Sequence, residues 1–261
     1  MRIAAAFLFL ILFATIACAA VTGREVQYEA EGISLKGYLA YDDAKEKRPG
    51  ILVVHEWWGH NKYARHRAEM LAGLGYVALA VDMYGEGKTA ETPDAAGTMA
   101  GAVMKNPSTM KTRFLAALDF LKQQENVDPA KLGAMGYCFG GGVVLAMARQ
   151  GVDLQGVVSF HGSLASTASG TPEKIKARIL VCNGADDKFV SADDIKKFKA
   201  DMKTAKADMT FINYPGSLHA FTNPEATENG KKFNMAIAYN EKADKKSWSD
   251  MQAFFKRVFG K

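Results

Sequence analysis

The feature that most constrains this chain is the segment 136–142, which reads Gly-Tyr-Cys-Phe-Gly-Gly-Gly. A short, mostly apolar run typical of a buried strand precedes it, and residues 143–149 read as the first turns of a helix. A strand that turns straight into a helix brings backbone segments close together, which requires glycine at Gly136 and Gly140. The pattern therefore predicts that Cys138 lies strained and exposed at the tip of the turn.

Two interpretations of Cys138 follow from this pattern. A strand, a Gly-x-nucleophile-x-Gly turn and a helix together form the nucleophile elbow of α/β hydrolases, in which the middle residue attacks the substrate. Cysteine stands here where most enzymes of that fold carry serine. In the alternative interpretation, the segment is only a glycine-rich turn, and Cys138 is a small, buried and inert hydrophobic residue.

The rest of the chain predicts an α/β fold with a mostly parallel twisted sheet and helices on both faces. Residues 24–30 and 33–41 alternate apolar and polar around a Glu-Gly pair, which indicates a hairpin at the sheet edge. Beyond the hairpin, apolar runs typical of buried strands alternate with helical spacing. We expect further strands at 50–55, 76–81, 130–135, 156–160, 177–182 and 209–214, helices at 61–74, 108–124 and 191–205, and a largely helical stretch at 230–259.

Residues 82–107 form the longest stretch in which apolar residues show neither helical nor strand periodicity. This stretch is rich in Gly, Thr, Ala and Met. Loops of this length inside a compact domain are often lids or binding loops. We therefore predict a loop here. The methionines of 99–110 either line an apolar pocket or pack a helix.

The first 20 residues differ in composition from the rest and predict a cleaved signal peptide. Arg2 is followed by an apolar run from 3 to 12 and by small residues up to Ala20. That run is short for a retained membrane anchor of about 20 residues, and residues 15–17 match a lipoprotein signal poorly, which argues against a lipid on Cys18. We expect cleavage near Ala20, a periplasmic or secreted protein, a single domain over residues 21–261 and no stable membrane span.

Charge and motif content argue against several kinds of partner. The formal net charge is +5, one unit of which leaves with Arg2, and the lysines are spread among acidic residues. The sequence contains neither a paired-cysteine metal motif nor His-Glu-x-x-His. We therefore expect no nucleic-acid partner, no metal and no cofactor, and the sequence does not indicate an oligomeric state.

Only Cys138 and Cys182 remain once the signal peptide is removed. Two cysteines in an exported protein suggest a disulfide. The expected sheet places another strand between them, which separates them by about 10 Å at about 4.8 Å per strand, whereas a disulfide needs Cα atoms within about 7 Å. We therefore expect Cys138 to be a free thiol, which is unusual for a purely structural residue in an oxidising compartment.

A catalytic Cys138 requires an acid after a later strand and then a histidine. Of the five histidines, only His219 lies beyond the expected acid, in the loop after the last expected strand. The acid is expected within 183–190, where Asp186 and Asp187 are both candidates. The chain order therefore meets the positional demands of a triad in which the histidine moves protons and the acid fixes its tautomer.

The same fold supplies an oxyanion hole from two backbone N–H groups. One comes from Phe139, directly after the nucleophile, and the other from the loop at 55–59. The helix after Cys138 points its N-terminus at the sulfur, which favours the thiolate. His161 follows a strand, and it either lines the pocket or is structural.

Four further aromatic or histidine residues have less specific expected positions. Trp57 and Trp58 could form a pocket wall. His60 and His66 are expected at the surface.

Taken together, these motifs resemble the dienelactone hydrolase family of α/β hydrolases over about residues 50–221. The resemblance is carried by His55-Glu56-Trp57-Trp58-Gly59, Asp82-Met83-Tyr84, Gly136-Tyr137-Cys138-Phe139-Gly140-Gly141, Gly184-Ala185-Asp186-Asp187-Lys188-Phe189-Val190 and His219-Ala220-Phe221. It implies a hydrolase that acts on a small-molecule ester or lactone through Cys138, Asp187 and His219.

The resemblance also implies roles that the residues alone do not settle. The family pattern G-x-x-D-x-x-V selects Asp187 over Asp186. It implies that Glu56 contacts Cys138 in the resting enzyme and controls the ionisation of the thiol, where the alternative is an ordinary loop carboxylate. It further implies that Trp57 donates the second oxyanion N–H and that Tyr84 lies near the pocket.

One departure from the family concerns substrate charge. Members that act on dienelactone have arginines just after the position of Tyr84 and after the catalytic histidine, and these bind the substrate carboxylate. Here 84–87 reads Tyr-Gly-Glu-Gly and 219–223 reads His-Ala-Phe-Thr-Asn. We therefore expect a neutral ester or lactone to be preferred over dienelactone. The alternatives are an acyltransferase or thioesterase with the same triad, and a non-catalytic binding module, which would require a missing triad member.

Overall fold

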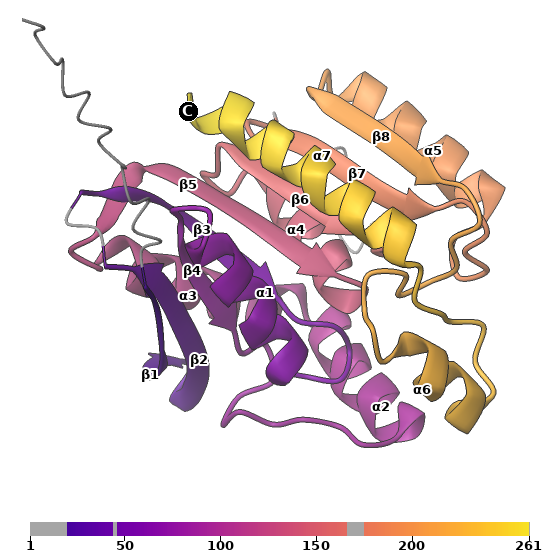
Figure 1. Cartoon of the computed structure of the whole chain (residues 1–261), viewed down its shortest axis with the longest axis horizontal. Coiled ribbons are helices and arrows are strands. Elements are labelled where there is room, and N and C mark those ends of the chain that lie inside the picture. Colours follow the sequence, from indigo (N-terminus) through magenta and orange to yellow (C-terminus); the bar gives the residue numbers. More distant parts are fainter. Residues whose placement is uncertain (1–19, 44–45, 166–174, 261) are drawn as a thin grey trace, which may run out of the picture.

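The chain folds around one central β-sheet with helices on both faces (Figure 1). The computed structural model describes residues 20–43, 46–165 and 175–260, so the predicted signal peptide, apart from Ala20, lies outside the described residues. In this part of the chain, eight strands form one sheet in the order β1-β2-β4-β3-β5-β6-β7-β8. Their bounds are β1 Val21–Ala30, β2 Ile33–Asp42, β3 Arg48–Val54, β4 Val77–Val81, β5 Val127–Tyr137, β6 Gly156–Phe160, β7 Arg178–Gly184 and β8 Met209–Tyr214.

The sheet is parallel from β4 to β8, and β1 and β2 form an antiparallel hairpin at one edge. This confirms the predicted α/β class and the predicted edge hairpin. Because β3, β5, β7 and β8 run in the same direction, the loops that follow them meet at one edge of the sheet, where ligands of such folds bind.

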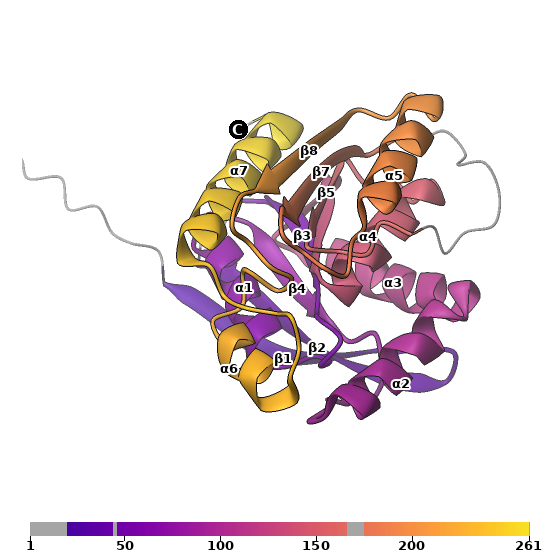
Figure 2. The ribbon, with the colours of Figure 1, turned by 90° about the vertical axis from the view of Figure 1, so that its right-hand side faces the viewer.

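Helices cover both faces of the sheet, as Figure 2 shows. Helices α1 and α7 lie on one face, where Leu71 and Phe255 belong to one buried apolar cluster. Helices α3, α4 and α5 lie on the other, where Phe114 and Phe198 belong to the second cluster. The helices are α1 Lys62–Ala72, α2 Pro93–Met104, α3 Pro107–Lys122, α4 Phe139–Arg149, α5 Ala192–Thr204, α6 Ala226–Phe233 and α7 Glu241–Phe259.

The predicted loop at 82–107 is wrong over part of its length, because it contains α2. Thr92 caps this helix by accepting a hydrogen bond from the N–H of Ala95, and a proline occupies its first turn. Its buried residues are Ala96 and Val103, and two glycines interrupt its interior. The helix therefore lacks the apolar stripe from which a helix is recognised in sequence.

The stretch 230–259, which was expected to be largely helical, contains the end of α6 and the whole of α7. Helix α6 begins earlier than expected, at Ala226, and ends at Asn234, which adopts the left-handed conformation with φ +51°. Helix α7 starts after Asn240, whose side chain accepts a hydrogen bond from the N–H of Ala243.

The elbow depends on the two glycines that the sequence singled out. A Cβ on Gly136 would lie 2.2 Å from the carbonyl oxygen of Gly140, and a Cβ on Gly140 would lie 2.3 Å from that of Val54 in β3. Neither position has room for a side chain. Cys138 between them has φ +53° and ψ −114°, a conformation that is uncommon for any residue except glycine. The predicted strained turn is therefore confirmed.

We expect Gly140→Ala to lower the free energy of unfolding by about 2–4 kcal/mol, because the new methyl group meets rigid backbone. The matched control is Gly101→Ala in α2, where nothing lies within 4 Å of an added Cβ. There we expect a gain of up to about 1 kcal/mol. Urea denaturation measures both, and a Gly140→Ala protein as stable as the wild type would contradict the argument.

Candidate active site

Cys138 lies between the end of β5 and the start of α4, at the sheet edge where the loops converge. It is partly exposed, which does not fit the alternative of a buried, inert residue. Its backbone N–H donates hydrogen bonds to the carbonyl oxygen of Phe160, at 3.0 Å, and to Nδ1 of His161, at 3.1 Å. These two contacts hold the strained backbone in place.

The structure brings Cys138, His219 and Asp187 together in that order. Nε2 of His219 lies 3.1 Å from Sγ of Cys138, and Nδ1 of His219 lies 2.8 Å from Oδ2 of Asp187. The other oxygen of Asp187 accepts a hydrogen bond from the N–H of Phe189 at 2.8 Å. Asp187 is buried, whereas Asp186 is exposed, so Asp187 is the aspartate placed to orient the imidazole.

The charges of its two partners dominate the ionisation of His219. Burial opposes protonation of the ring, but a negative Cys138 thiolate and the Asp187 carboxylate outweigh it and raise the pKa of His219 to about 10. The imidazolium form of His219 is therefore favoured at neutral pH, with Nε2 facing the sulfur of Cys138.

Phe139 and Trp57, the two residues expected to donate N–H groups to an oxyanion, line one cavity together with Cys138. The N–H of Phe139 is the first of α4, so it has no carbonyl partner within the helix. Trp57 follows β3, and its carbonyl oxygen accepts a hydrogen bond from the hydroxyl of Tyr84 at 2.8 Å. Tyr84 thus fixes the loop that carries the second expected donor.

Glu56 is 3% exposed and lines the cavity beside the thiol. Its Oε2 accepts a hydrogen bond from Nδ2 of Asn223 at 2.6 Å, while the sulfur of Cys138 is engaged by His219. Burial raises the pKa of Glu56 to about 7. The carboxyl therefore changes its charge within the physiological range, next to the Cys138 thiol.

Two cavities meet at the reactive pair. A cavity of about 90 Å³ extends past Trp58 towards Met235 and Ile237. A second cavity of about 230 Å³ extends past Phe139 towards Ala100 and Met104 of α2. They share four lining residues, namely Trp57, Cys138, Phe189 and His219. Their walls are mostly apolar, and none of their described lining residues is Arg or Lys.

Not every residue expected near the pocket lines it. Trp58 does, whereas Tyr84 lies behind the Trp57 loop and His161 is fully buried beneath Cys138. The prediction that His60 is a surface residue is wrong: it is 3% exposed. Its loop is covered because the neighbouring Gly59 forms a β-bridge with the segment after Tyr84.

The sequence did not single out two residues that contact the site. Phe189 is 56% exposed, and its ring centroid lies 4.9 Å from that of His219. An aromatic residue two positions after the candidate acid was the available signal. Asn223 lies in the segment that lacks the family's arginine, and its amide donates a hydrogen bond to Glu56.

Cys138 and Cys182 are free cysteines, and β6 lies between their strands as predicted. Within the described residues, no group of three His, Cys, Asp or Glu side chains is placed to hold a metal ion. No helix in residues 20–43, 46–165 and 175–260 is long and apolar enough to cross a membrane.

The fold and the elbow define an α/β hydrolase. Two solved structures resemble the chain across nearly its whole length. One is the dienelactone hydrolase-like promiscuous phosphotriesterase P91 from metagenomic libraries, at 33% identity and TM-score 0.87. The other is m3DLH, at 34% identity and TM-score 0.87. Each alignment covers 92% of this chain and 99% of the solved one.

The sequence comparisons narrow the class further. Protein usf of Aquifex pyrophilus is 31% identical over 239 residues, which are 90% of this chain and 98% of the relative. Residues 35–259 match the dienelactone hydrolase family. The chain belongs to this family, as the resemblance indicated, and it is a hydrolase that acts on ester or lactone bonds.

We expect Glu56→Gln to stabilise the protein at pH 8 and to change little at pH 4.5. Between about pH 4.5 and 7 the folded protein keeps a proton on Glu56 that the unfolded chain releases. This carboxyl therefore destabilises the fold increasingly as the pH rises through that window, by on the order of 3 kcal/mol at its upper end. The neutral amide removes the effect, and thermal denaturation at both pH values measures it.

The control for this prediction is Glu91→Gln, at an exposed carboxylate. Its difference in melting temperature from the wild type should be the same at both pH values. If Glu56→Gln behaved like this control, the buried carboxyl would not titrate as described.

Proposed function

We propose that this hydrolase acts on neutral carboxylic esters or lactones through a thioester on Cys138. One observation carries the proposal: hydrogen-bonding distances run unbroken from Sγ of Cys138 through His219 to Asp187, at the junction of two apolar cavities. A substrate whose carbonyl carbon lies at Sγ can extend its acyl group into one cavity and its alcohol into the other. This arrangement supports nucleophilic acyl transfer.

Acylation begins with attack of the thiolate on the carbonyl carbon. The carbonyl oxygen becomes an oxyanion, which the N–H groups of Phe139 and Trp57 stabilise in the proposed site. As the tetrahedral intermediate collapses, the C–O bond to the alcohol breaks. The imidazolium of His219 gives its Nε2 proton to the departing oxygen, and the acyl group remains on Sγ as a thioester.

Deacylation uses the same groups in reverse. His219, now neutral, accepts a proton from water, and the hydroxide adds to the thioester carbonyl. The C–S bond then breaks, which releases the carboxylic acid and restores the thiolate–imidazolium pair. Asp187 holds Nδ1–H throughout, so that Nε2 always faces the reacting atoms. An acyltransferase or thioesterase would use the same steps and differ only in the acceptor or the leaving group.

The cavity walls support a neutral substrate. Phe189, Met104 and Ile237 offer apolar contacts, and Glu56 would repel an anionic group beside it once it is ionised. A substrate carboxylate would lose its hydration on entering the cavities. No described lining residue is a cation that could pair with it, so its binding would be unfavourable. The missing arginines and the apolar walls therefore both favour a neutral substrate.

We also propose that residues 1–20 are a cleaved signal peptide and that the mature enzyme, residues 21–261, is a single periplasmic or secreted domain. The N-terminal composition supports this proposal. So does the start of β1 at Val21, directly after the expected cleavage site. Expression of the full chain in a Gram-negative host, followed by cell fractionation and N-terminal sequencing, tests it.

We expect Cys138→Ala to lower kcat for 4-nitrophenyl acetate by at least about 10³-fold, because no thioester can form. Cys182→Ala removes the other described thiol, which is buried in β7 away from the cavities, and should keep the wild-type rate. Release of 4-nitrophenol measures both. A Cys138→Ala enzyme as fast as the wild type would eliminate the proposed nucleophile.

A matched pair of substrates tests the charge preference. 4-Nitrophenyl butyrate and mono-4-nitrophenyl succinate share a leaving group and have similar acyl lengths, but only the succinate carries a carboxylate. We expect kcat/KM to favour the butyrate by at least about tenfold, which corresponds to about 1.4 kcal/mol. Dienelactone should likewise be a poor substrate, and efficiency on dienelactone far above that on neutral esters would refute the preference.

A further inference from the structure

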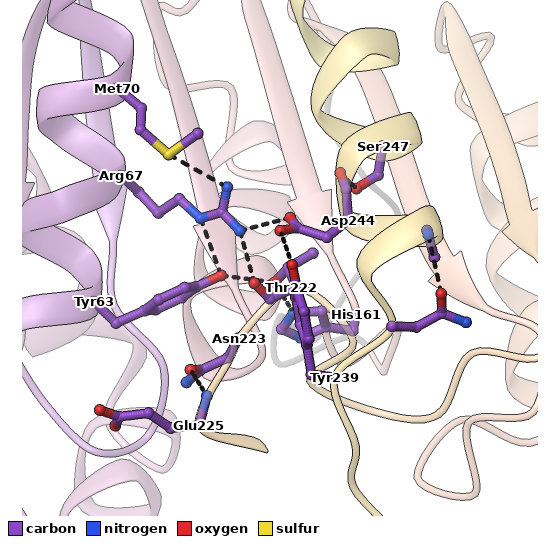
Figure 3. A network of polar contacts seen from close by, with 12 residues as sticks. Tyr63, Arg67, Met70, His161, Thr222, Asn223, Glu225, Tyr239, Asp244 and Ser247 are labelled. Atoms are coloured by element: carbon purple, nitrogen blue, oxygen red, sulfur yellow. Dashed lines mark hydrogen bonds and ion pairs between the residues drawn. The ribbon is translucent and has the colours of Figure 1, made fainter. Parts of the chain in front are cut away.

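A buried polar network reaches from α1 to α7 (Figure 3), and its His161 is hydrogen-bonded to the backbone of Cys138. Nε2 of His161 lies 2.8 Å from Oγ1 of Thr222, which in turn lies 2.7 Å from the hydroxyl of Tyr63. Arg67 donates from Nη2 to the carbonyl oxygen of Thr222 at 2.7 Å and to Oδ1 of Asp244 at 2.6 Å. None of these groups takes part in the proposed reaction steps.

The tautomer of His161 follows from its two partners. The backbone N–H of Cys138 can only donate, so Nδ1 of His161 must carry a lone pair. The single proton of the neutral ring is then on Nε2, which donates it to Thr222. Burial, together with the positive charges of His219 and Arg67, lowers the pKa of His161 well below its usual value. The ring is therefore neutral and is held in one orientation.

This ring connects two segments that are far apart in the chain. Its Nδ1 holds the amide of Cys138, and its Nε2 holds Thr222, three residues after His219 on the same loop. The ring also packs edge-on against His219, with 5.2 Å between the ring centroids. The elbow and the histidine loop are thus joined through groups other than the reacting atoms.

The far side of the histidine loop is held by a buried ion pair. The side chains of Arg67 and Asp244 are 4% and 12% exposed, and they belong to α1 and α7, two helices packed on the same face of the sheet. Arg67 also donates from Nε to the hydroxyl of Tyr63 at 3.2 Å. Thr222 is therefore fixed to rigid elements on one side and to His161 on the other.

Strained backbone conformations occur at the elbow, at His161 and in the histidine loop. Cys138, His161 and Ala220 are non-glycine residues with positive φ, at +53°, +39° and +59°. Such conformations persist only where surrounding contacts hold them. The hydrogen bonds of His161 reach the first of these residues directly and the loop of the third through Thr222.

We propose that His161 is a positioning residue that, through Thr222, sets the approach of His219 to the Cys138 thiol. One ring nitrogen fixes the elbow, the other fixes the histidine loop, and the 3.1 Å separation of Nε2 and Sγ depends on both. This inference rests on the proposed catalytic pair. It adds that the pair is aligned by a third, neutral histidine that does not touch the substrate.

Two substitutions at one position test this link. Thr222→Val keeps the size of threonine but lacks the hydroxyl, whereas Thr222→Ser keeps the hydroxyl and lacks the methyl group. We expect Thr222→Val to lower kcat for 4-nitrophenyl acetate about tenfold, with KM changed less than about twofold. Thr222→Ser should restore kcat to within about threefold of the wild type. An equal loss in both variants would overturn the proposal, because packing rather than the hydrogen bond would then be responsible.

A second readout does not depend on ester hydrolysis. The rate at which iodoacetamide alkylates Cys138, measured against pH, reports the thiolate that His219 stabilises. We expect Thr222→Val, but not Thr222→Ser, to move the midpoint of this profile to higher pH. Cys138→Ala corrects for any labelling of Cys182. If the wild type hydrolysed no ester, these profiles would still test the role of His161. Failure of the proposed function can therefore be distinguished from failure of this inference.

His161→Gln provides an independent variant if Thr222→Val does not fold. Glutamine can reach Thr222 from near the position of Nε2, but it leaves the N–H of Cys138 without its acceptor at Nδ1. We expect the same loss of kcat and the same displaced alkylation profile. A folded His161→Gln or Thr222→Val protein with wild-type values in both assays would overturn the proposal.

Discussion

The site depends on backbone-to-backbone contact around Gly136, Gly140 and Val54. Because neither glycine has a side chain, α4 can begin directly against the ends of β3 and β5. That contact places the thiol, the first N–H of α4 and the loop that carries Trp57 at one point on the sheet edge. A methyl group added at either glycine would push these three groups apart. The chemistry of the site therefore depends on Gly136 and Gly140 having no Cβ atom.

Features defined by chain order or by local sterics could be predicted from the sequence. The elbow required glycine on both sides of Cys138, and the order of nucleophile, acid and base left His219 as the one histidine in the right place. The choice of Asp187 over Asp186 was different. Local pattern left both open, and only the family resemblance separated them, because burial against the imidazole depends on how the loop after β7 folds.

Features that depend on contacts between distant segments could not be predicted in this way. Glu56 and Asn223 are separated by 167 residues, and no periodicity in the sequence relates them. His161 was recognised only as a histidine after a strand, since its two partners, Cys138 and Thr222, lie 23 and 61 residues away in the chain. Helix α2 was missed because it buries little and therefore lacks an apolar stripe.

The absence of cationic residues from the described cavity walls has a consequence for the end of the proposed reaction. Hydrolysis converts a neutral substrate into a carboxylate, and it does so beside Glu56, which is also negative above about pH 7. The walls that accept the ester therefore disfavour the acid that is made from it. In the proposed reaction, hydrolysis therefore weakens the binding of the molecule in the pocket, which favours release of the product.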